Sequence, residues 1–205
     1  VAMATGKYYV QCPSVLQVKL TGRKAPWVSA KDVILKILQE LSVKGGVNKI
    51  VEYTGEGLSD LSLTDRATIC NMGAELGATT SVFPTDENAL AYLKQQGRED
   101  EYVEMKADDD ATYDETIEID MSTLVPMVAQ PHSPDNVVDV KELEGMKINQ
   151  VVIGSCTNSS LPDMMRAAKI LKGRKVAEDV SLVIAPGSSS ILSMLAQNGA
   201  LADMI

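Results

Sequence analysis

The sequence is poor in the residues from which many active sites are built. Its 205 residues include one histidine, His132, and three cysteines, Cys12, Cys70 and Cys156. A single histidine excludes zinc sites and proton relays that are built on several histidines. Three widely spaced cysteines do not make a disulfide framework, and they fit a reducing cytoplasm better than secretion.

Long apolar runs and an excess of positive charge are also missing. No segment reaches the roughly 20 apolar residues that a membrane-spanning helix needs, so we expect no membrane association. Lysine and arginine total 19 against 28 aspartates and glutamates, for a net charge of −9. A chain of this sign binds phosphate backbones poorly, so we expect no nucleic-acid partner. Hydrophobic residues make up 45% of the chain, which is enough for a packed core.

The sequence does contain an alternation of strand and helix patterns. Residues 15–20 alternate between apolar and polar side chains, as is typical of a half-buried strand, and residues 8–10 are prone to form a strand. Further strands are predicted at residues 49–53, 79–83, 116–119, 151–153 and 180–184. Serine or aspartate N-caps predict helices that begin near residues 30, 63, 87, 161 and 189. The alternation predicts the α/β class, with three α/β/α layers and mostly parallel sheets.

Two polar segments interrupt this alternation. Residues 99–115 carry nine acidic side chains without the spacing of a calcium-binding loop, which favours a solvated surface over a cation site. Residues 130–136 form a polar connector that contains two prolines. We therefore predict one α/β domain over residues 1–140 and the start of a second over residues 141–205.

The first candidate site is the turn at residues 154–158. Cys156 follows the strand predicted at residues 151–153, which we expect to be buried, and it precedes a helix. Backbone N–H groups and the helix dipole at that place stabilise a thiolate. The thiolate could be a nucleophile or a metal ligand, and a cysteine without a chemical role fits the spacing as well. A nucleophile needs a base, but His132 lies in the connector. A metal ligand needs partners, and neither of the other cysteines forms a Cys-x-x-Cys pair.

The second candidate site lies on the helix predicted over residues 64–76. Asn71 and Glu75 are four residues apart and would share one face, which Thr68 extends by a turn. An amide and a carboxylate placed so could meet a polar ligand, although a solvent-facing polar stripe has the same pattern. Gly73 inside this helix indicates close packing.

These motifs stand in the order found in the aconitase family of iron–sulfur hydro-lyases, which the sequence resembles over nearly its whole length. The resemblance implies aconitase-type domains and the interconversion of citrate and isocitrate through cis-aconitate, a reaction of the tricarboxylic acid cycle. The alternative within the family is 3-isopropylmalate or homoaconitate hydratase, but residues 77–84 are more similar to the citrate branch. The matching segments are residues 4–7, 26–34, 52–55, 68–84, which include 71–75, and 154–158.

The resemblance also implies roles for single residues. Cys156 would be one of three thiolates that hold a [4Fe–4S] cluster, whose fourth iron acts as a Lewis acid on a tricarboxylic acid substrate. Glu75 would be catalytic and face the hydroxyl that leaves, and Asn71 would lie near the cluster. Asn158 and Thr157 would shape the turn around Cys156.

Several of the family's functional residues have no counterpart in this sequence. They are the other two cluster cysteines, the active-site histidines, the arginines that bind substrate carboxylates and the serine that abstracts a proton. The resemblance therefore implies an internal fragment, inactive alone, that needs the remaining domains of its parent enzyme. Outside the hydro-lyases, a cysteine-nucleophile enzyme and a non-catalytic α/β binding module stay open, although the acidic charge disfavours a module that binds RNA.

Overall fold

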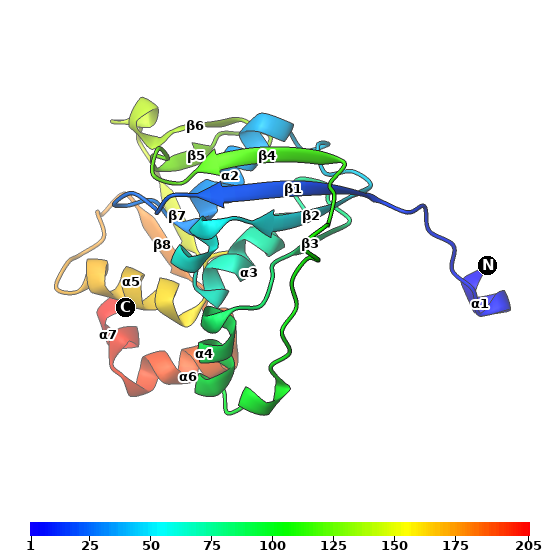
Figure 1. Cartoon of the computed structure of the whole chain (residues 1–205). Helices are drawn as coiled ribbons and strands as arrows, with labels where there is room; N and C mark the ends of the chain where they lie inside the picture. The colour runs from blue at the N-terminus through cyan, green and yellow to red at the C-terminus, as the bar shows by residue number, and fades with distance from the viewer.

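A four-stranded sheet in which every neighbouring pair is parallel organises the first part of the chain (Figure 1). The computed structural model describes residues 1–205. Leu16, Val18 and Leu20 are buried on one face of the central strand, which confirms the predicted alternation. In spatial order the strands are β3 (Thr80–Val82), β2 (Lys49–Thr54), β1 (Ser14–Thr21) and β4 (Glu115–Asp120).

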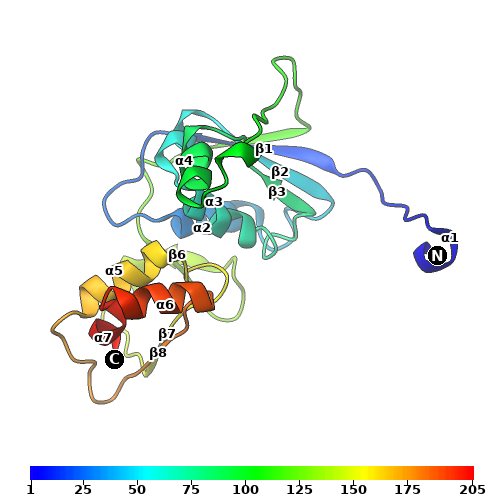
Figure 2. The same ribbon diagram turned by 90° about the horizontal axis from the view of Figure 1, so that it is seen from below.

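Two helices, α2 (Ala30–Leu41) and α3 (Leu63–Asn71), pack against each other on one face of this sheet (Figures 1 and 2). Each begins with the predicted capping box, Ser29 with Asp32 and Ser62 with Asp65. The helix α4 (Glu87–Gln95) begins at its predicted cap, and the short 3₁₀ segments are η1 (Glu56–Asp60) and η2 (Glu99–Glu101). A cluster of 21 buried apolar residues joins the sheet to α2 and α3.

The proline-bearing connector is the loop of an antiparallel hairpin. It joins β5 (Met127–Ala129) to β6 (Val137–Asp139), and the 3₁₀ segment η3 (Val140–Leu143) follows. The hairpin is tied to α2, because the Met127 N–H donates to Asp32 Oδ1 at 2.7 Å and Gln39 Nε2 donates to the Val137 carbonyl at 3.0 Å. The hairpin is thereby held against α2.

The last part of the chain is a smaller α/β unit. Strands β7 (Gln150–Ile153) and β8 (Ser181–Ile184) pair in parallel, as predicted, and a separate cluster of six buried residues lies beside them. Figure 2 shows the three helices of this unit grouped apart from the four-stranded sheet. These helices are α5 (Leu161–Leu171), α6 (Ser189–Gln197) and α7 (Ala200–Met204).

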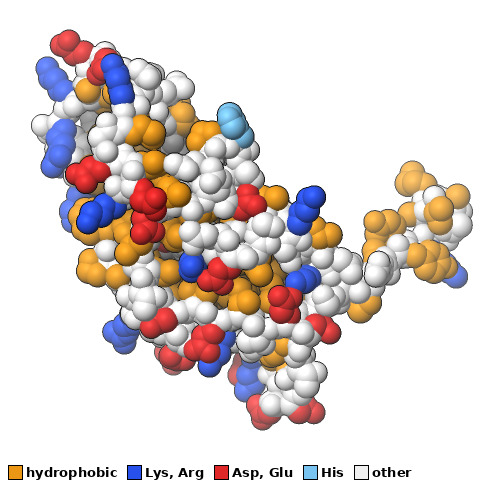
Figure 3. All heavy atoms as spheres, turned by 90° about the horizontal axis from the view of Figure 1, so that it is seen from above, with side chains coloured by type: hydrophobic (Ala, Val, Ile, Leu, Met, Phe, Trp, Pro, Cys, Tyr) orange, Lys and Arg blue, Asp and Glu red, His pale blue; other side chains and the backbone are white.

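The structure corrects two expectations about strands. Residues 8–10 form no strand; after the short helix α1 (Ala2–Thr5) the chain runs exposed to β1, and apolar side chains stand on this projecting segment (Figure 3). The strand at residues 151–153 is not buried, because β8 is the sole strand paired with β7 and Val152 is left 64% exposed.

The predicted fold class is confirmed. The molecule is α/β with mostly parallel sheets, consistent with the three-layer arrangement expected for aconitase-type domains. All nine acidic side chains of residues 99–115 are exposed. No helix of the structure has both the length and the apolar character required to cross a bilayer. The boundary proposed near residue 140 stays a prediction.

Candidate active site

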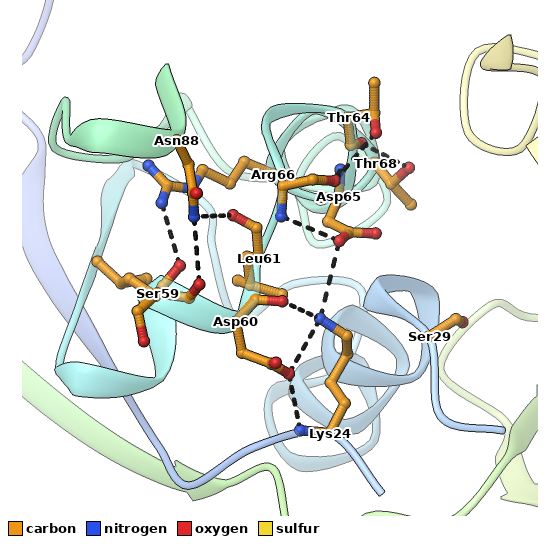
Figure 4. A network of polar contacts seen from close by, with 12 residues as sticks. Lys24, Ser29, Ser59, Asp60, Leu61, Thr64, Asp65, Arg66, Thr68 and Asn88 are labelled. Atoms are coloured by element: carbon orange, nitrogen blue, oxygen red, sulfur yellow. Dashed lines mark hydrogen bonds and ion pairs between the residues drawn. The ribbon is translucent and has the colours of Figure 1, made fainter. Parts of the chain in front are cut away.

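A network of polar contacts holds the beginning of α3 (Figure 4). Lys24 Nζ lies 3.2 Å from Asp60 Oδ2 and 3.7 Å from Asp65 Oδ2, so it joins η1 to the first turn of α3. Arg66 is only 2% exposed, and its Nη2 donates to the Leu58 carbonyl at 3.0 Å and pairs with Asp86 at the start of α4. These contacts fix the helix that carries the second motif.

Burial and hydrogen bonding have opposite effects on the pKa of the Asp86 carboxyl group. Burial by itself would raise the pKa of the Asp86 carboxyl. The hydrogen bonds that it accepts from Arg66 and from the Ala89 N–H outweigh burial and hold its pKa below the ordinary value. Asp86 is therefore a charged partner for Arg66 as well as the N-cap of α4.

The α-helix that carries the second motif ends at Asn71, earlier than predicted. Tighter turns follow, in which the Glu75 N–H donates to the Met72 carbonyl at 3.2 Å. At Gly77, with φ +78°, the chain closes in a Schellman motif: the Ala78 N–H donates to the Gly73 carbonyl and the Gly77 N–H to the Ala74 carbonyl, each at 3.0 Å. The spacing predicts that Asn71 and Glu75 share one face of a helix. This prediction is wrong, because the regular helix ends at Asn71 and Glu75 lies in the turns that follow.

Gly73 lets this segment pack closely against β3. A Cβ at position 73 would lie 2.5 Å from Ser81 Oγ and 3.0 Å from the Cys70 carbonyl oxygen. The backbone therefore approaches β3 more closely than any other residue would allow, as the close packing predicted at Gly73 requires.

The turn that carries Cys156 is held by its own side chains and by the turn after β8. Ser155 adopts φ +69°, and its hydroxyl lies 2.8 Å from Thr157 Oγ1. The Ser159 hydroxyl donates to the Ser155 carbonyl, while the Gly187 N–H donates to the Ser159 carbonyl at 3.2 Å. A positive φ at a serine is uncommon, and these contacts keep the turn in that conformation.

The structure brings the two predicted motifs together. Asn71 Nδ2 donates to the Cys156 carbonyl at 2.7 Å, and Thr68 Oγ1 donates to the Thr157 carbonyl at 2.8 Å. These pairs are 85 and 89 residues apart in the sequence. Two adjacent carbonyls of one turn thus accept from two side chains on successive turns of α3.

Two cavities flank this junction. One, of about 340 Å³, is lined by Glu75 and Met72 together with apolar residues of α2 and β5. The other, of about 330 Å³, runs along residues 152–155 and includes Asn158. Lys31 and Thr157 line both cavities. A larger cavity of about 640 Å³ over β5, β6 and η3 contains none of the predicted site residues.

Lys31 lies in a segment that matches the family, but no motif in the sequence indicates a role for it. A local signal was present: Lys31 is the second residue of α2, where a positive charge opposes the helix dipole.

The cysteines divide into one candidate ligand and two that lie in other parts of the fold. Cys156 and Cys12 are exposed, whereas Cys70 is half-buried and burial raises the pKa of its thiol to about 11. No three side chains of histidine, cysteine, aspartate or glutamate are grouped so that they could hold a metal ion. The exposed Cys156 thiol fits a single cluster ligand, and a complete cluster site is not formed by these 205 residues. The single histidine side chain stands on the surface (Figure 3).

The comparisons with known proteins address the resemblance directly. The family described as "Aconitase family (aconitate hydratase)" matches residues 1–144 and 139–205. The chain belongs to the aconitase family. Its relatives include the 3-isopropylmalate dehydratase large subunit 2 of Archaeoglobus fulgidus, 45% identical over 191 residues that make up 93% of this chain and 46% of that protein.

Two bacterial members of the aconitase family are similarly related. The 3-isopropylmalate dehydratase large subunit of Clostridium kluyveri is 44% identical over 199 residues, or 97% of this chain and 47% of its own length. That of Caldicellulosiruptor saccharolyticus is 45% identical over 199 residues, which cover 46% of it. The chain spans about half the length of these relatives. Their names favour the isopropylmalate alternative over the citrate branch and give no support to a place in the tricarboxylic acid cycle.

Proposed function

We propose that this chain is part of a hydro-lyase of the 3-isopropylmalate dehydratase type, which removes and adds water on a small 2-hydroxy dicarboxylic acid. The observation that carries the proposal is the hydrogen bond from Asn71 to the Cys156 carbonyl. It joins two motifs that the sequence marks separately, and it sets a candidate cluster ligand beside the cavity that Glu75 lines. The relatives' names supply the choice of branch.

The first role belongs to the Cys156 turn. Cys156 would provide one of three thiolates for a [4Fe–4S] cluster, and the other two would come from residues outside this chain. When bound, the cluster supplies an iron that acts as a Lewis acid towards the substrate. Asn71 and Thr68 bind the carbonyls of Cys156 and Thr157, so they would position the turn that carries the thiol without touching the sulfur atom. Asn158 lines the cavity beside the Cys156 turn, and it would help to shape that turn.

Glu75 would carry the proton chemistry on the leaving group. Its carboxyl group would donate a proton to the substrate hydroxyl, so that the hydroxyl departs as water, and in the hydration direction the carboxylate would accept that proton back. The turn at residues 72–77 exposes Glu75 at the rim of the cavity, where a substrate can reach it. The group that removes the proton from the adjacent carbon would lie outside this chain.

The proposed partners follow from the relatives. Since the relatives are more than twice as long as the matched region and are named large subunits, the active protein would comprise a longer chain and a smaller second subunit. A cytoplasmic location fits a cluster that needs reduced cysteines.

The test uses the full-length parent protein with its second subunit. After anaerobic reconstitution with iron and sulfide, the protein should dehydrate 3-isopropylmalate faster than citrate or homocitrate, as measured by the ultraviolet absorbance of the unsaturated product. Faster turnover of citrate would return the assignment to the citrate branch. No turnover of any hydroxy acid by a protein that carries its cluster would overturn the proposal.

The same reconstitution of the 205-residue chain serves as the control. We expect no stable cluster and no hydratase activity, because one thiolate does not hold four irons. A stoichiometric cluster with hydratase activity in this chain alone would overturn the division of ligands described above.

A further inference from the structure

We infer that Lys31 is a substrate-binding residue that holds a carboxylate group of the hydroxy dicarboxylic acid. The inference rests on the proposed function and adds to it a specific contact, which the sequence motifs did not indicate. It is drawn from the position of Lys31 on α2, from its lack of a charged partner and from the two cavities that it lines.

The position of Lys31 is unfavourable unless an anion is near. It lies in the first turn of α2, where the helix dipole repels positive charge. Lys31 takes part in no ion pair and in no side-chain hydrogen bond, although it is half-buried. By contrast, Lys36 on the same helix pairs with Glu40 at 3.3 Å and donates to Gln39 Oε1 at 3.1 Å. Lys24, which is also half-buried, lies between two carboxylates. Lys31 is thus a half-buried lysine whose ammonium group makes no ion pair within the fold.

Lys31 lies between the Glu75 segment and the Cys156 turn, because it lines a cavity beside each of them. Lys31 lines the cavity of about 340 Å³ with Glu75, and it also lines the cavity of about 330 Å³ that borders the Cys156 turn. Leu35, one helical turn further along α2, lines the first cavity too, so this face of α2 forms a wall of the site. A ligand that reaches from Glu75 towards the Cys156 turn therefore passes Lys31.

The chemistry of the cavity selects the ligand class. Lys31 is the only cationic residue that lines it and Glu75 the only acidic one; most of the rest are apolar, among them Leu35, Met72 and Val128. An anionic group would pair with the ammonium, while a hydroxyl would be within reach of the Glu75 carboxyl group. A carbon branch would lie on the apolar wall. A hydroxy dicarboxylate with an aliphatic substituent satisfies these three surfaces together.

The test compares three variants of the full-length parent protein in complex with its second subunit and reconstituted with its cluster. In Lys31→Met we expect KM to rise at least about tenfold with a smaller change in kcat, because the carboxylate contact is made by substrate and transition state alike. Lys31→Arg, which keeps the charge, should recover much of that loss. The matched control, Lys36→Met on the same helix, should keep the KM of the wild-type protein.

A binding measurement separates the contact from a structural effect. 2-Isopropylsuccinate, which lacks the leaving hydroxyl, is titrated calorimetrically into the same proteins, alongside its two monoamides. One monoamide should bind the wild-type protein at least about tenfold more weakly than the diacid, whereas Lys31→Met should bind both about equally well. If Lys31→Met does not fold, Lys31→Gln and Lys31→Arg carry the comparison.

The outcomes distinguish this inference from the proposed function. Turnover by the wild-type protein together with an unchanged KM in Lys31→Met overturns the role of Lys31 and leaves the proposed function intact. A higher KM for which both monoamides lose the same factor in wild-type and variant also overturns it, since the lysine then acts through structure. A wild-type protein that neither turns over nor binds the diacid overturns both.

Discussion

The two hydrophobic clusters differ in how completely they enclose their sheets. In the first, 21 buried residues join a four-stranded sheet to its helices, and the strand β1 has a partner on each side. In the second, six buried residues lie against a sheet of only two strands, which leaves Val152 and Val183 64% and 43% exposed. Two parallel strands rarely form a stable sheet alone. The first region therefore encloses its sheet much more completely than the second. The core of the second region is small, so we expect its stability to depend more on contacts with other parts of the protein.

The strongest test of this difference removes one buried leucine from each cluster. Leu38 and Leu195 are both fully buried, so replacing either by alanine should cost about 2–5 kcal/mol in its own region. We expect Leu195→Ala to release the amides of α5, α6 and α7 to hydrogen exchange while those of β1 and β2 stay protected. Leu38→Ala should lower protection throughout the first region, as followed by exchange mass spectrometry.

The control for this pair is Leu192→Ala on α6, where the side chain is 43% exposed and little protection should be lost. Loss of protection in β1 and β2 upon Leu195→Ala would contradict the comparison, because the two clusters would then unfold as one.

The next effect in size concerns the polar network under α3. Arg66→Met removes the donor for the Leu58 and Pro84 carbonyls and leaves Asp86 without its partner. Asp86 is one third exposed and keeps some hydration, so the cost is smaller than for a fully buried pair. We expect the free energy of unfolding to fall by about 2 kcal/mol in urea titrations. Arg98→Met, which breaks an exposed pair with Glu101, serves as control and should leave the midpoint unchanged. Equal midpoints for the two variants would show that the network does not stabilise the first region.

A smaller effect is expected where the two regions meet. Asn71→Ala removes the hydrogen bond to the Cys156 carbonyl, which is worth about 1 kcal/mol. Hydrogen exchange in residues 154–159 should quicken while the core of the first region keeps its protection. Asn149→Ala alters an exposed side chain with no hydrogen bond of its own and is the matched control. Unchanged exchange in the Cys156 turn would mean that the regions are coupled by other contacts.

The mildest probe is chemical and uses the three thiols. Burial raises the pKa of Cys70 to about 11, so its reactive thiolate is scarce at pH 8, roughly one molecule in a thousand. Cys156 and Cys12 are exposed and should be alkylated first by iodoacetamide, as read by peptide mass spectrometry. Raising the pH towards 11 should bring Cys70 into reaction. Early labelling of Cys70 at pH 8 would show that the first region opens more readily than its packing indicates.

Local rules account for much of what the sequence predicted. The capping boxes at Ser29 and Ser62 depend on residues three positions apart, and both formed as expected. The end of α3 was predicted less well: the helix ends at Asn71, and the segment after it packs against Ser81 of β3, a contact that the local pattern does not contain. The exposure of Val152 could not be foreseen either, because an apolar run does not reveal how many strands will pair with it.

The candidate site shows the same division. Asn71, Glu75 and Cys156 were chosen from their motifs, but no spacing rule predicts a contact across 85 residues. No motif predicts a role for Lys31, because the role inferred for it depends on the two cavities that it lines in the folded chain.

The contacts between α3 and the Cys156 turn have a consequence for engineering. Asn71 and Thr68 bind main-chain carbonyls, so the junction makes no use of the sulfur atom. The hydrogen bonds that hold the turn therefore do not depend on the thiol of Cys156. A serine or alanine at position 156 would keep the same backbone conformation. Such a variant would offer an oxygen-tolerant stand-in for crystallisation and ligand screening, in which the architecture of the site survives although its chemistry has been removed.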